Sequence, residues 1–529
     1  MELSRADHGE VPPRIEVPRS YNAAFDLIQR NLSAGRSDKL AYIDDRGLYS
    51  YADLAQRVDR AANAFLALGL VREQRVLLAL LDTIDFPTVF LGAIKAGIVP
   101  VAANTLLTAN DYRYILDDSR AVALIVSPPL LPTFEQVFRD GGAANLRETI
   151  VAGEAAPPHR RLDDLLAMAG TSFEAAATTC DDPCFWLYSS GSTGAPKGTV
   201  HVQASMVQTA ELYGRPVLGI REDDVVFSAA KLFFAYGLGN ALSFPLSVGA
   251  TTVLMAERPT PGAVFKRLVE HRPTIFYGVP TLYAAMLAAT DFPTRESLNL
   301  RRCVSAGEPL PAEIGRRFRE RTGVDILDGI GSTEMLHIFL SNRPEDVRYG
   351  TTGVPVPGYE LRIVDEEGRD VADGEPGELL IRGPTAATGY WNNRARSRTT
   401  FLGEWTRSGD KYQRDAAGYY VYCGRNDDML KVSGMWVSPT EVEAAIITHP
   451  AVLEAAVVAW EDEDRLVKPR AFIVLRPGES AGSQLASEIQ EHVKQRLAPY
   501  KYPRRVEFIA ELPKTATGKI QRYKLRGAH

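Results

Sequence analysis

The sequence predicts a multidomain α/β protein. It should have a large N-terminal domain, made of two α/β layered subdomains and a β-barrel-like subdomain, and a small α+β C-terminal domain. The chain has 529 residues, 45% of them apolar, which is enough for more than one core. Strand-like runs alternate with amphipathic helical patterns along the first two-thirds, as in parallel α/β layers. From about Gly353 shorter β-rich segments with many Gly and Pro turns follow, which indicates the barrel-like unit.

Capping signals and apolar spacing predict the individual elements. Ser50 and Asp53 form a capping box that begins a helix, and Gly69 is placed to end it. Apolar runs predict strands in the α/β part at 76–81, 122–126 and 274–277. In the β-rich part, strands are predicted at 361–364 and 378–382.

A separate α+β unit is predicted at the C-terminal end. Ser438 supplies a hydroxyl N-cap, Pro439 occupies the first turn and Glu441 follows three residues after the cap, so a helix begins here. Strands at 455–459 and 471–475 and a helix over 485–497 complete the unit. We place the boundary at Asn426 and Asp427, which gives domains 1–426 and 427–529.

The composition argues against several classes of protein. A net charge of −6 leaves no overall basic field, so nucleic acid is not expected as a partner. No apolar stretch reaches the length of a membrane span, and the N-terminus lacks the apolar region of a signal peptide. The cysteines are few, which suits a reducing compartment, and Cys180 and Cys184 are too widely spaced for a C-x-x-C pair. We therefore expect a soluble, cytoplasmic protein without a membrane partner.

The run YSSGSTGAPKG, from Tyr188 to Gly198, is the strongest local signal. Gly191 and Gly194 let backbone N–H groups approach a ligand, while hydroxyl groups and a lysine add donors and charge, an arrangement that suits an anion. It is not a Walker A loop, because Pro196 and Gly198 occupy positions where that motif needs Gly and Ser or Thr. A flexible Gly/Ser surface loop is the alternative. The polar side chains of the run are Ser189, Ser190, Ser192, Thr193 and Lys197.

Further motifs follow in order along the chain. They are GSTE at Gly331–Glu334, SGD at Ser408–Asp410, GRNDD at Gly424–Asp428 and PKTATGK at Pro513–Lys519. Together with the Gly-rich run they resemble the acyl-adenylate-forming family, the AMP-dependent synthetases and ligases, over nearly the whole chain. This family contains the acyl- and aryl-CoA ligases, the adenylation domains of peptide synthetases and the luciferases. Within it the chain most resembles the benzoate-CoA ligases.

The resemblance implies a reaction in two steps that uses ATP, Mg²⁺ and coenzyme A. A carboxylate attacks the α-phosphate of ATP, which gives an acyl-adenylate and releases pyrophosphate. The thiol of coenzyme A then displaces AMP and forms a thioester. Because two anions must first be brought together, catalysis should depend largely on positioning and charge neutralisation.

The resemblance also implies a role for each residue of the nucleotide site. The loop 189–198 holds the β- and γ-phosphates, Thr333 contacts the α-phosphate and Glu334 helps to hold Mg²⁺. Asp410 accepts the ribose hydroxyls, and Lys519 neutralises charge at the transferring oxygens. Taken singly, such charges are more often surface ion pairs or solvated carboxylates, so the argument depends on the ordered set of motifs. The other implied ATP-binding residues are Gly307, Glu308, Pro309, Asp328 and Arg425.

The second step gives a reason for two domains. The family rotates its small mobile domain between the steps, and Asp427 occupies the family's hinge position. Rotation would withdraw Lys519 and bring Lys431 to the site as a second catalytic lysine. The resemblance places a tunnel for the CoA thiol at Ser433, Gly434 and Trp436, where the glycine leaves room for the pantetheine arm.

The acyl pocket is predicted from residues that lie between these motifs. Phe233–Leu238 contains no acidic residue to pair an amino group, and Asp328–Ser332 contains no Trp to close the pocket. The result is a flat, mostly apolar slot that fits benzoate or a lightly substituted analogue. Many relatives have Tyr at the position of Ile330, so this position departs from the family pattern. Ordinary core packing is the alternative interpretation for every pocket residue. The predicted pocket residues are Phe234, Ala235, Tyr236, Gly278, Ala306, Gly331, His337 and Ile338.

Other functions stay open at this point. The acyl group could pass to a carrier-protein thiol, the chain could be a luciferase-like oxidoreductase, or it could sense nucleotides without catalysis. Lys519, Glu334 and Asp410 are intact, which argues against a non-catalytic protein, and the lack of a fused carrier domain favours free CoA. A homodimer is compatible with the resemblance.

Overall fold

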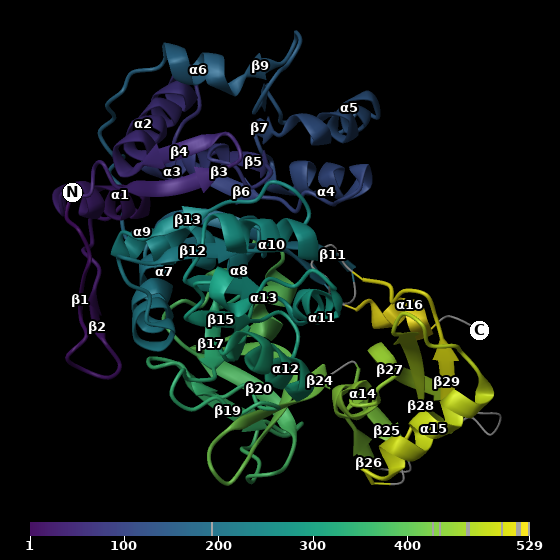
Figure 1. Cartoon of the computed structure of the whole chain (residues 1–529). Coiled ribbons are helices and arrows are strands. Elements are labelled where there is room, and N and C mark those ends of the chain that lie inside the picture. Colours follow the sequence, from purple (N-terminus) through teal and green to yellow (C-terminus); the bar gives the residue numbers. More distant parts are fainter. Residues whose placement is uncertain are drawn as a thin grey trace.

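The computed structural model describes residues 1–191, 194–425, 428–432, 435–461, 466–498, 501–514 and 520–526. Within these residues, sheets of eight, nine and five strands make up the large N-terminal part, and a three-stranded sheet forms the core of the small C-terminal part (Figure 1). This is the multidomain α/β architecture that the sequence predicts.

The eight-stranded sheet has the order β21-β11-β10-β6-β5-β7-β8-β9. In this order, β10, β6, β5, β7, β8 and β9 are parallel to one another. β11 pairs antiparallel with both β10 and β21. The strands are β5 (Arg75–Ala79), β6 (Val99–Ala102), β7 (Ala123–Val126), β8 (Glu148–Val151), β9 (Arg160–Arg161), β10 (Pro183–Gly191), β11 (Gly194–Val202) and β21 (Gly389–Tyr390). The helices of this part are α2 (Tyr51–Ala67), α3 (Asp85–Lys95), α4 (Ala109–Ser119), α5 (Leu131–Arg139) and α6 (Leu162–Met168), with a 3-10 turn at Pro128–Leu130.

The nine-stranded sheet has the order β18-β17-β16-β15-β14-β12-β13-β3-β4, and its six central strands, from β16 to β3, are parallel. The strands are β3 (Leu40–Asp44), β4 (Gly47–Ser50), β12 (Val225–Ser228), β13 (Thr251–Val253), β14 (Ile275–Gly278), β15 (Arg302–Ser305), β16 (Ile326–Gly331), β17 (Ile338–Ser341) and β18 (Val354–Pro355). The helices are α1 (Ala23–Ser33), α7 (Ser205–Thr209), η2 (Ala210–Leu218), α8 (Ala235–Leu238), η3 (Gly239–Ser243), α9 (Phe244–Val248), α10 (Pro261–Glu270), α11 (Pro280–Ala288), η4 (Arg295–Ser297) and α12 (Ala312–Thr322).

Helix α3 lies in the core that the two large sheets share. All eleven of its residues are buried, and this core includes side chains from both sheets. Its charged ends are paired: Asp85 accepts hydrogen bonds from Arg46 at 2.7 Å and Arg57 at 2.9 Å, and Lys95 binds Asp59. Neither α3 nor any other helix in the described parts of the chain has the length and apolarity needed to cross a membrane.

Every predicted element is present, although most begin or end one or a few residues away from the predicted positions. Ser50 and Asp53 form the capping box of α2, whose last turn is followed by Gly69 at φ +76°. The strand predicted at 76–81 is shorter: β5 ends at Ala79, and Leu80 is buried beyond its end. Apolar residues continue past the last strand pairing here, which makes the run look longer than the strand.

The β-rich part forms a five-stranded antiparallel sheet next to β17 and β18. β20 pairs with β19 and β23, and β23 also pairs with β22 and β24. The elements are β19 (Glu360–Val364), β20 (Gly377–Arg382), α13 (Arg394–Thr400), β22 (Phe401–Leu402), β23 (Trp405–Arg414) and β24 (Tyr420–Arg425).

The C-terminal part contains its own core. Val442, Val457, Ile473 and Ile489 are fully or almost fully buried there, and Ser438 caps the helix whose start the sequence predicts. The helix predicted over 485–497 spans Ser483–Lys494 instead. The elements are β25 (Leu430–Val432), β26 (Met435–Val437), α14 (Pro439–Ile447), β27 (Val452–Glu461), β28 (Val467–Leu475), α15 (Ser483–Lys494), β29 (Arg505–Phe508) and α16 (Arg522–Arg526).

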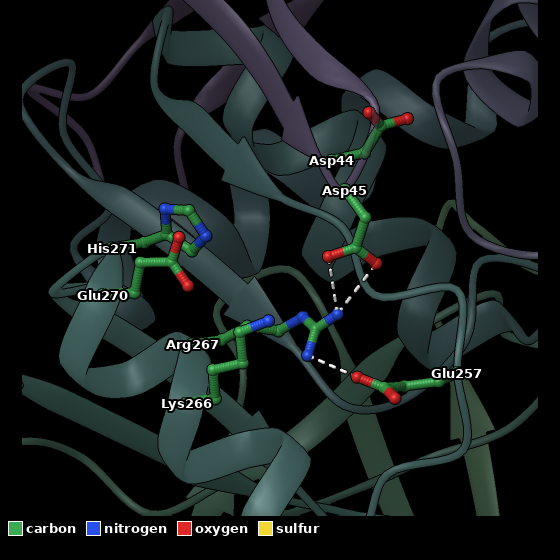
Figure 2. Close-up of a pocket in the computed structure, with 7 residues that line it drawn as sticks. All are labelled: Asp44, Asp45, Glu257, Lys266, Arg267, Glu270 and His271. Carbon is green, nitrogen blue, oxygen red and sulfur yellow. Dashed lines mark hydrogen bonds and ion pairs between the residues drawn. The ribbon is translucent and has the colours of Figure 1, made fainter.

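Arg267 of α10 is a buried arginine at the edge of a surface cavity of about 410 Å³ (Figure 2). Its guanidinium donates to both oxygens of Asp45 at 2.9 Å and to Glu257 at 2.6 Å. These bonds tie α10 to the turn between β3 and β4. The cavity therefore has a structural ion-pair cluster as its wall.

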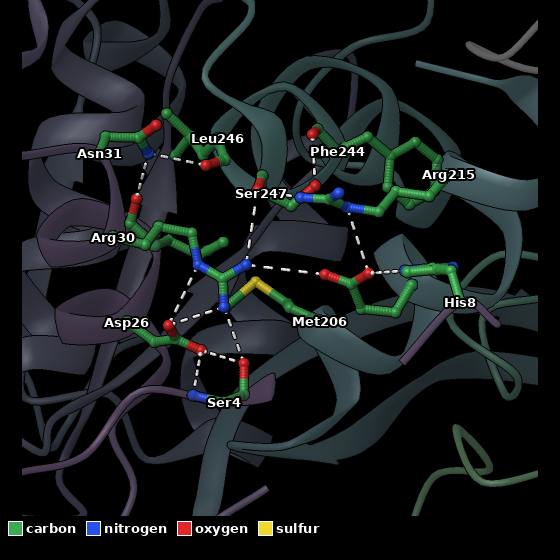
Figure 3. A network of polar contacts seen from close by, with 12 residues as sticks. Ser4, His8, Asp26, Arg30, Asn31, Met206, Arg215, Phe244, Leu246 and Ser247 are labelled. Carbon is green, nitrogen blue, oxygen red and sulfur yellow. Dashed lines mark hydrogen bonds and ion pairs between the residues drawn. The ribbon is translucent and has the colours of Figure 1, made fainter. Parts of the chain in front are cut away.

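The N-terminal hairpin, β1 (Arg5–Asp7) and β2 (Arg14–Glu16), is attached to the body by a buried polar network (Figure 3). Asp26 of α1 accepts hydrogen bonds from Ser4 and Arg30, and Arg30 also lies 3.6 Å from Glu211 of η2. His8 reaches Glu211 at 2.7 Å. Because Asp26 and Glu211 are buried, these pairs fix the hairpin to both α1 and η2.

Candidate active site

Three of the predicted pocket residues lie at the carboxyl ends of the parallel strands β14, β15 and β16. Gly278 ends β14, Ala306 follows β15 and Gly331 ends β16. Parallel strands place their carboxyl ends at one edge of a sheet, which is where α/β proteins bind ligands. The GSTE motif begins at Gly331, so Thr333 and Glu334 lie at the same edge.

The described residues of the Gly-rich run lie on the paired antiparallel strands β10 and β11. Ser189 and Lys197 are register partners on the two strands, as are Gly191 and Gly194. The buried hydroxyl of Ser189 has no hydrogen-bond partner among the described residues, so it is free to donate to a ligand. Ser190 also lies on β10, and Ser192 and Thr193 lie outside the described residues.

Lys197, Glu334 and Tyr390 form one cluster. The phenol of Tyr390 donates to Glu334 Oε1 at 2.7 Å, and Lys197 Nζ donates to the phenol oxygen at 3.2 Å. Lys197 Nζ is also 3.7 Å from Glu334 Oε1. The sequence analysis missed Tyr390, because it lies on a two-residue strand with no local signal.

Burial sets the protonation behaviour of this cluster. It lowers the pKa of Lys197, and nearby Arg396 and Arg425 lower it further, whereas Glu334 acts in the opposite direction. Burial and the Glu334 carboxylate raise the pKa of Tyr390, so its phenol keeps its proton and donates. Converging cations suit a triphosphate. Arg396, on α13, was not among the predicted site residues.

A histidine side chain binds the backbone of Thr333. His201 Nε2 lies 2.8 Å from the Thr333 carbonyl oxygen and must donate, because a carbonyl only accepts. Burial lowers the pKa of His201 to about 4, so the ring is neutral near pH 7. His201 is on β11, and this bond therefore links the Gly-rich hairpin to the GSTE motif. A lone histidine gave no motif from which the sequence could predict this contact.

Asp410 and Arg425, from two separate motifs, are register partners on β23 and β24. Their side chains are 3.2 Å apart, and Asp410 is buried. Gly409 has φ +75°, and a Cβ there would lie 2.9 Å from the Arg425 guanidinium, so the SGD motif needs its glycine. The pair holds the carboxylate of the SGD motif next to the arginine of the GRNDD motif.

The predicted adenine segment, Gly307–Pro309, meets the C-terminal part of the chain. Glu308 accepts a 3.0 Å hydrogen bond from the backbone N–H of Ile520. Nearby, burial raises the pKa of Asp328 well above its ordinary range, although the N–H groups of Leu310 and Gly329 oppose the shift. Asp328 Oδ1 has no partner in the described parts of the chain, so it can take a donor from a ligand.

The predicted acyl residues divide into two groups. Phe234, Ala235, Tyr236 and Gly331 keep accessible surface, whereas Gly278, Ala306, His337 and Ile338 are buried. The Tyr236 phenol donates to the Val304 carbonyl at 3.2 Å, which fixes its ring beside β15. The accessible group can line a ligand directly, while the buried group shapes the wall from behind.

Among the buried residues of this group, His337 makes hydrogen bonds that hold the pocket wall in place. Its Nε2 lies 3.2 Å from both the Tyr236 carbonyl oxygen and Asn240 Oδ1, and burial lowers its pKa to about 3. The neutral ring therefore donates from Nε2. A Cβ at Gly331 would lie 2.5 Å from the His337 carbonyl oxygen, so only glycine permits this close approach of β16 and β17.

Glu334 is the predicted metal ligand. Mg²⁺ usually takes one or two protein carboxylates together with substrate phosphates and water. The described residues contain no cluster of three or more acidic, His or Cys side chains that could hold a metal by themselves. Both contacts of Glu334 use Oε1, and Oε2 has no partner in the described part of the chain. One free carboxylate oxygen beside a phosphate loop fits Mg²⁺.

Several predicted residues cannot be placed in the site. Lys431 and Trp436 lie on β25 and β26, where only their backbone is described. The others, Asp427, Ser433, Gly434 and Lys519, lie outside the described residues.

Comparison with known proteins shows the family. Residues 29–391 match the AMP-binding enzyme model and residues 441–519 match the AMP-binding enzyme C-terminal domain. The chain belongs to the AMP-binding enzyme family, as the motifs predict. It is 63% identical to the benzoate–CoA ligase of Thauera aromatica, over 99% of each chain.

Solved structures agree with this assignment. A benzoate CoA ligase from Burkholderia xenovorans LB400 matches with a TM-score of 0.90 and 56% identity, covering 96% of this chain and 100% of that one. The anthranilate CoA ligase AuaEII, in complex with anthranoyl-AMP, matches with a TM-score of 0.93 and 45% identity, covering 96% and 97%.

Proposed function

We propose that the protein is a cytoplasmic, ATP-dependent aryl-CoA ligase. It converts benzoate or a close analogue to the acyl-adenylate and then to the CoA thioester, releasing pyrophosphate and AMP. The observation that carries the proposal is that the GSTE motif contacts both sides: Glu334 is paired with Lys197 of the Gly-rich run, and Gly331 is paired with Ile338 of the predicted apolar slot. The full-length similarity to a benzoate–CoA ligase supports the aromatic substrate.

The site residues act by holding two anions together. Lys197 and the N–H groups of the Gly-rich hairpin bind the phosphates, Thr333 contacts the α-phosphate and Asp410 holds the ribose. The Phe234 and Tyr236 rings place the aromatic acid so that its carboxylate faces the α-phosphate. Mg²⁺, bound at Glu334, supplies charge neutralisation at the phosphates.

In this proposal a different lysine serves each of the two steps. Lys519 stabilises the charge that develops as the carboxylate oxygen bonds to phosphorus and pyrophosphate leaves. After rotation at Asp427, Lys431 and the Ser433–Trp436 loop receive the CoA thiol, whose sulfur bonds to the carbonyl carbon as AMP leaves and the thiol proton is released. The proposal places the domain boundary between residues 426 and 427, and Asp428 beyond it binds Arg526 of α16.

AMP release across a panel of benzoates and alkanoates, with and without CoA, tests the function. We expect CoA-dependent AMP release with benzoate and little with long alkanoates. If benzoate and ATP gave a stable adenylate that CoA did not discharge, the acceptor would be a carrier-protein thiol instead. Light scattering tests the homodimer that the proposal includes, and fractionation tests the cytoplasmic location, which four free cysteines support.

A further inference from the structure

Tyr390 lies between the two charged side chains of the phosphate site. It donates to Glu334 Oε1 at 2.7 Å, accepts from Lys197 Nζ at 3.2 Å, and its ring centroid is 4.5 Å from the Lys197 ammonium. A single neutral side chain therefore contacts both charges by three different interactions.

The phenol is held rigidly with respect to both partners. β21 pairs with β11, so Tyr390 is fixed to the strand that carries Lys197, and Trp391 N–H donates to the Gly198 carbonyl at 2.7 Å. The Tyr390 ring is buried and packs on Phe401 at 5.3 Å. On the other side, Ala387 N–H donates to the Glu334 carbonyl at 2.8 Å.

Lys197 and Glu334 attract each other and already form a long ion pair. Lys197 Nζ and Glu334 Oε1 are 3.7 Å apart and both side chains are mostly buried. Opposite charges at this separation attract strongly when little water screens them. A closed ion pair would occupy the groups that must face opposite partners, Lys197 a phosphate and Glu334 a cation.

We propose that Tyr390 is a positioning residue that keeps the ion pair between Lys197 and Glu334 long and confined to Oε1, so that Lys197 can still bind the triphosphate and Glu334 can still bind Mg²⁺. The inference rests on the proposed ATP site and adds a residue to it. The phenol satisfies one Glu334 oxygen and one Lys197 proton without adding charge, and leaves Glu334 Oε2 for the metal.

The test is Tyr390→Phe, which keeps the ring under the ammonium and removes the hydroxyl. Loss of a hydrogen bond to a charged group is worth roughly tenfold or more in binding. We expect KM for MgATP and the Mg²⁺ concentration for half-maximal adenylation each to rise about tenfold. Excess Mg²⁺ should recover Tyr390→Phe but not Glu334→Gln. Thioester formation from preformed benzoyl-adenylate should stay at the wild-type rate.

Tyr349→Phe is a matched control. The Tyr349 phenol donates to the Asp325 carboxylate at 2.6 Å, and Asp325 is paired with Arg319 at 3.3 Å, so the same kind of bond is removed away from the site. A melting temperature that falls equally in both variants, with no change in Mg²⁺ dependence, would show that Tyr390 is only structural. Wild-type protein that forms no adenylate would instead overturn the proposed function.

Discussion

The backbone N–H of Ile520 donates a 3.0 Å hydrogen bond to the carboxylate of Glu308, which joins the C-terminal part of the chain to the predicted adenine segment. Ile520 also forms an isolated antiparallel bridge with Lys514. Lys519 directly precedes Ile520 in the sequence. In our proposal Lys519 acts in adenylate formation, and the Ile520–Glu308 contact joins the neighbouring part of the chain to the predicted adenine segment.

Lys519→Ala should slow adenylation. Removing one group that stabilises a developing oxyanion costs about 10²-fold in other enzymes, so we expect a loss of at least about that size. Supplied with preformed benzoyl-adenylate, the variant should still make benzoyl-CoA. Rapid quench of each half-reaction measures the two rates separately, and equal slowing of both would contradict the assignment of Lys519 to one step.

Asp427→Pro should slow thioester formation while adenylate still forms, and Lys431→Ala should give the same pattern. Arg425 is tied to Asp410 at 3.2 Å and Asp428 to Arg526, and the hinge that we propose falls between these two anchors. Proline fixes φ at the hinge and restricts the residue before it. Asp427→Ala leaves φ free and is the control. Rapid quench again measures the two half-reactions separately. A normal rate of thioester formation in Asp427→Pro would rule out a hinge at this residue.

Local signals predicted the elements, whereas long-range contacts set the site. The capping box at Ser50 and the N-cap at Ser438 could be predicted because all their atoms come from residues close together in the sequence. The motif residues could be predicted from family resemblance. Tyr390 could not be predicted, because its partner Lys197 is 193 residues away and no sequence pattern connects the two. His201 was missed for the same reason, since its partner is the backbone carbonyl of Thr333.

Substrate selectivity should depend on Phe234. Its ring keeps accessible surface, whereas the adjacent Phe233 is buried in the core and lies 4.3 Å from it, centroid to centroid. Wild-type enzyme should accept small ortho or meta groups, such as fluoro or amino, and discriminate against bulky para groups. A misfit of this kind is worth about 1–3 kcal/mol, or roughly 10–200-fold in kcat/KM. Phe234→Ala should reduce this discrimination.

Phe233→Leu is the control for this selectivity experiment, and it should lower stability without changing the order of substrates. The measurement is kcat/KM for benzoate and a para-substituted series. Turnover of octanoate by the wild-type enzyme at the rate of benzoate would contradict the slot altogether.

Stability should fall below about pH 6.5 in part because of His201 and His337. Burial lowers their pKa values to about 4 and about 3, below the ordinary value of 6.5, so the unfolded chain binds protons that the folded protein does not. The stabilisation is fully present above pH 6.5 and is lost as the pH falls toward those values, by up to about 1.4 kcal/mol per pH unit for each proton. His201→Gln keeps a donor for the Thr333 carbonyl and removes the titrating ring. Urea unfolding at pH 7 and pH 5 should therefore show a smaller loss of stability in His201→Gln than in wild type, with His337→Gln as an independent second case. Identical losses in all three proteins would mean that neither histidine is kept neutral by burial.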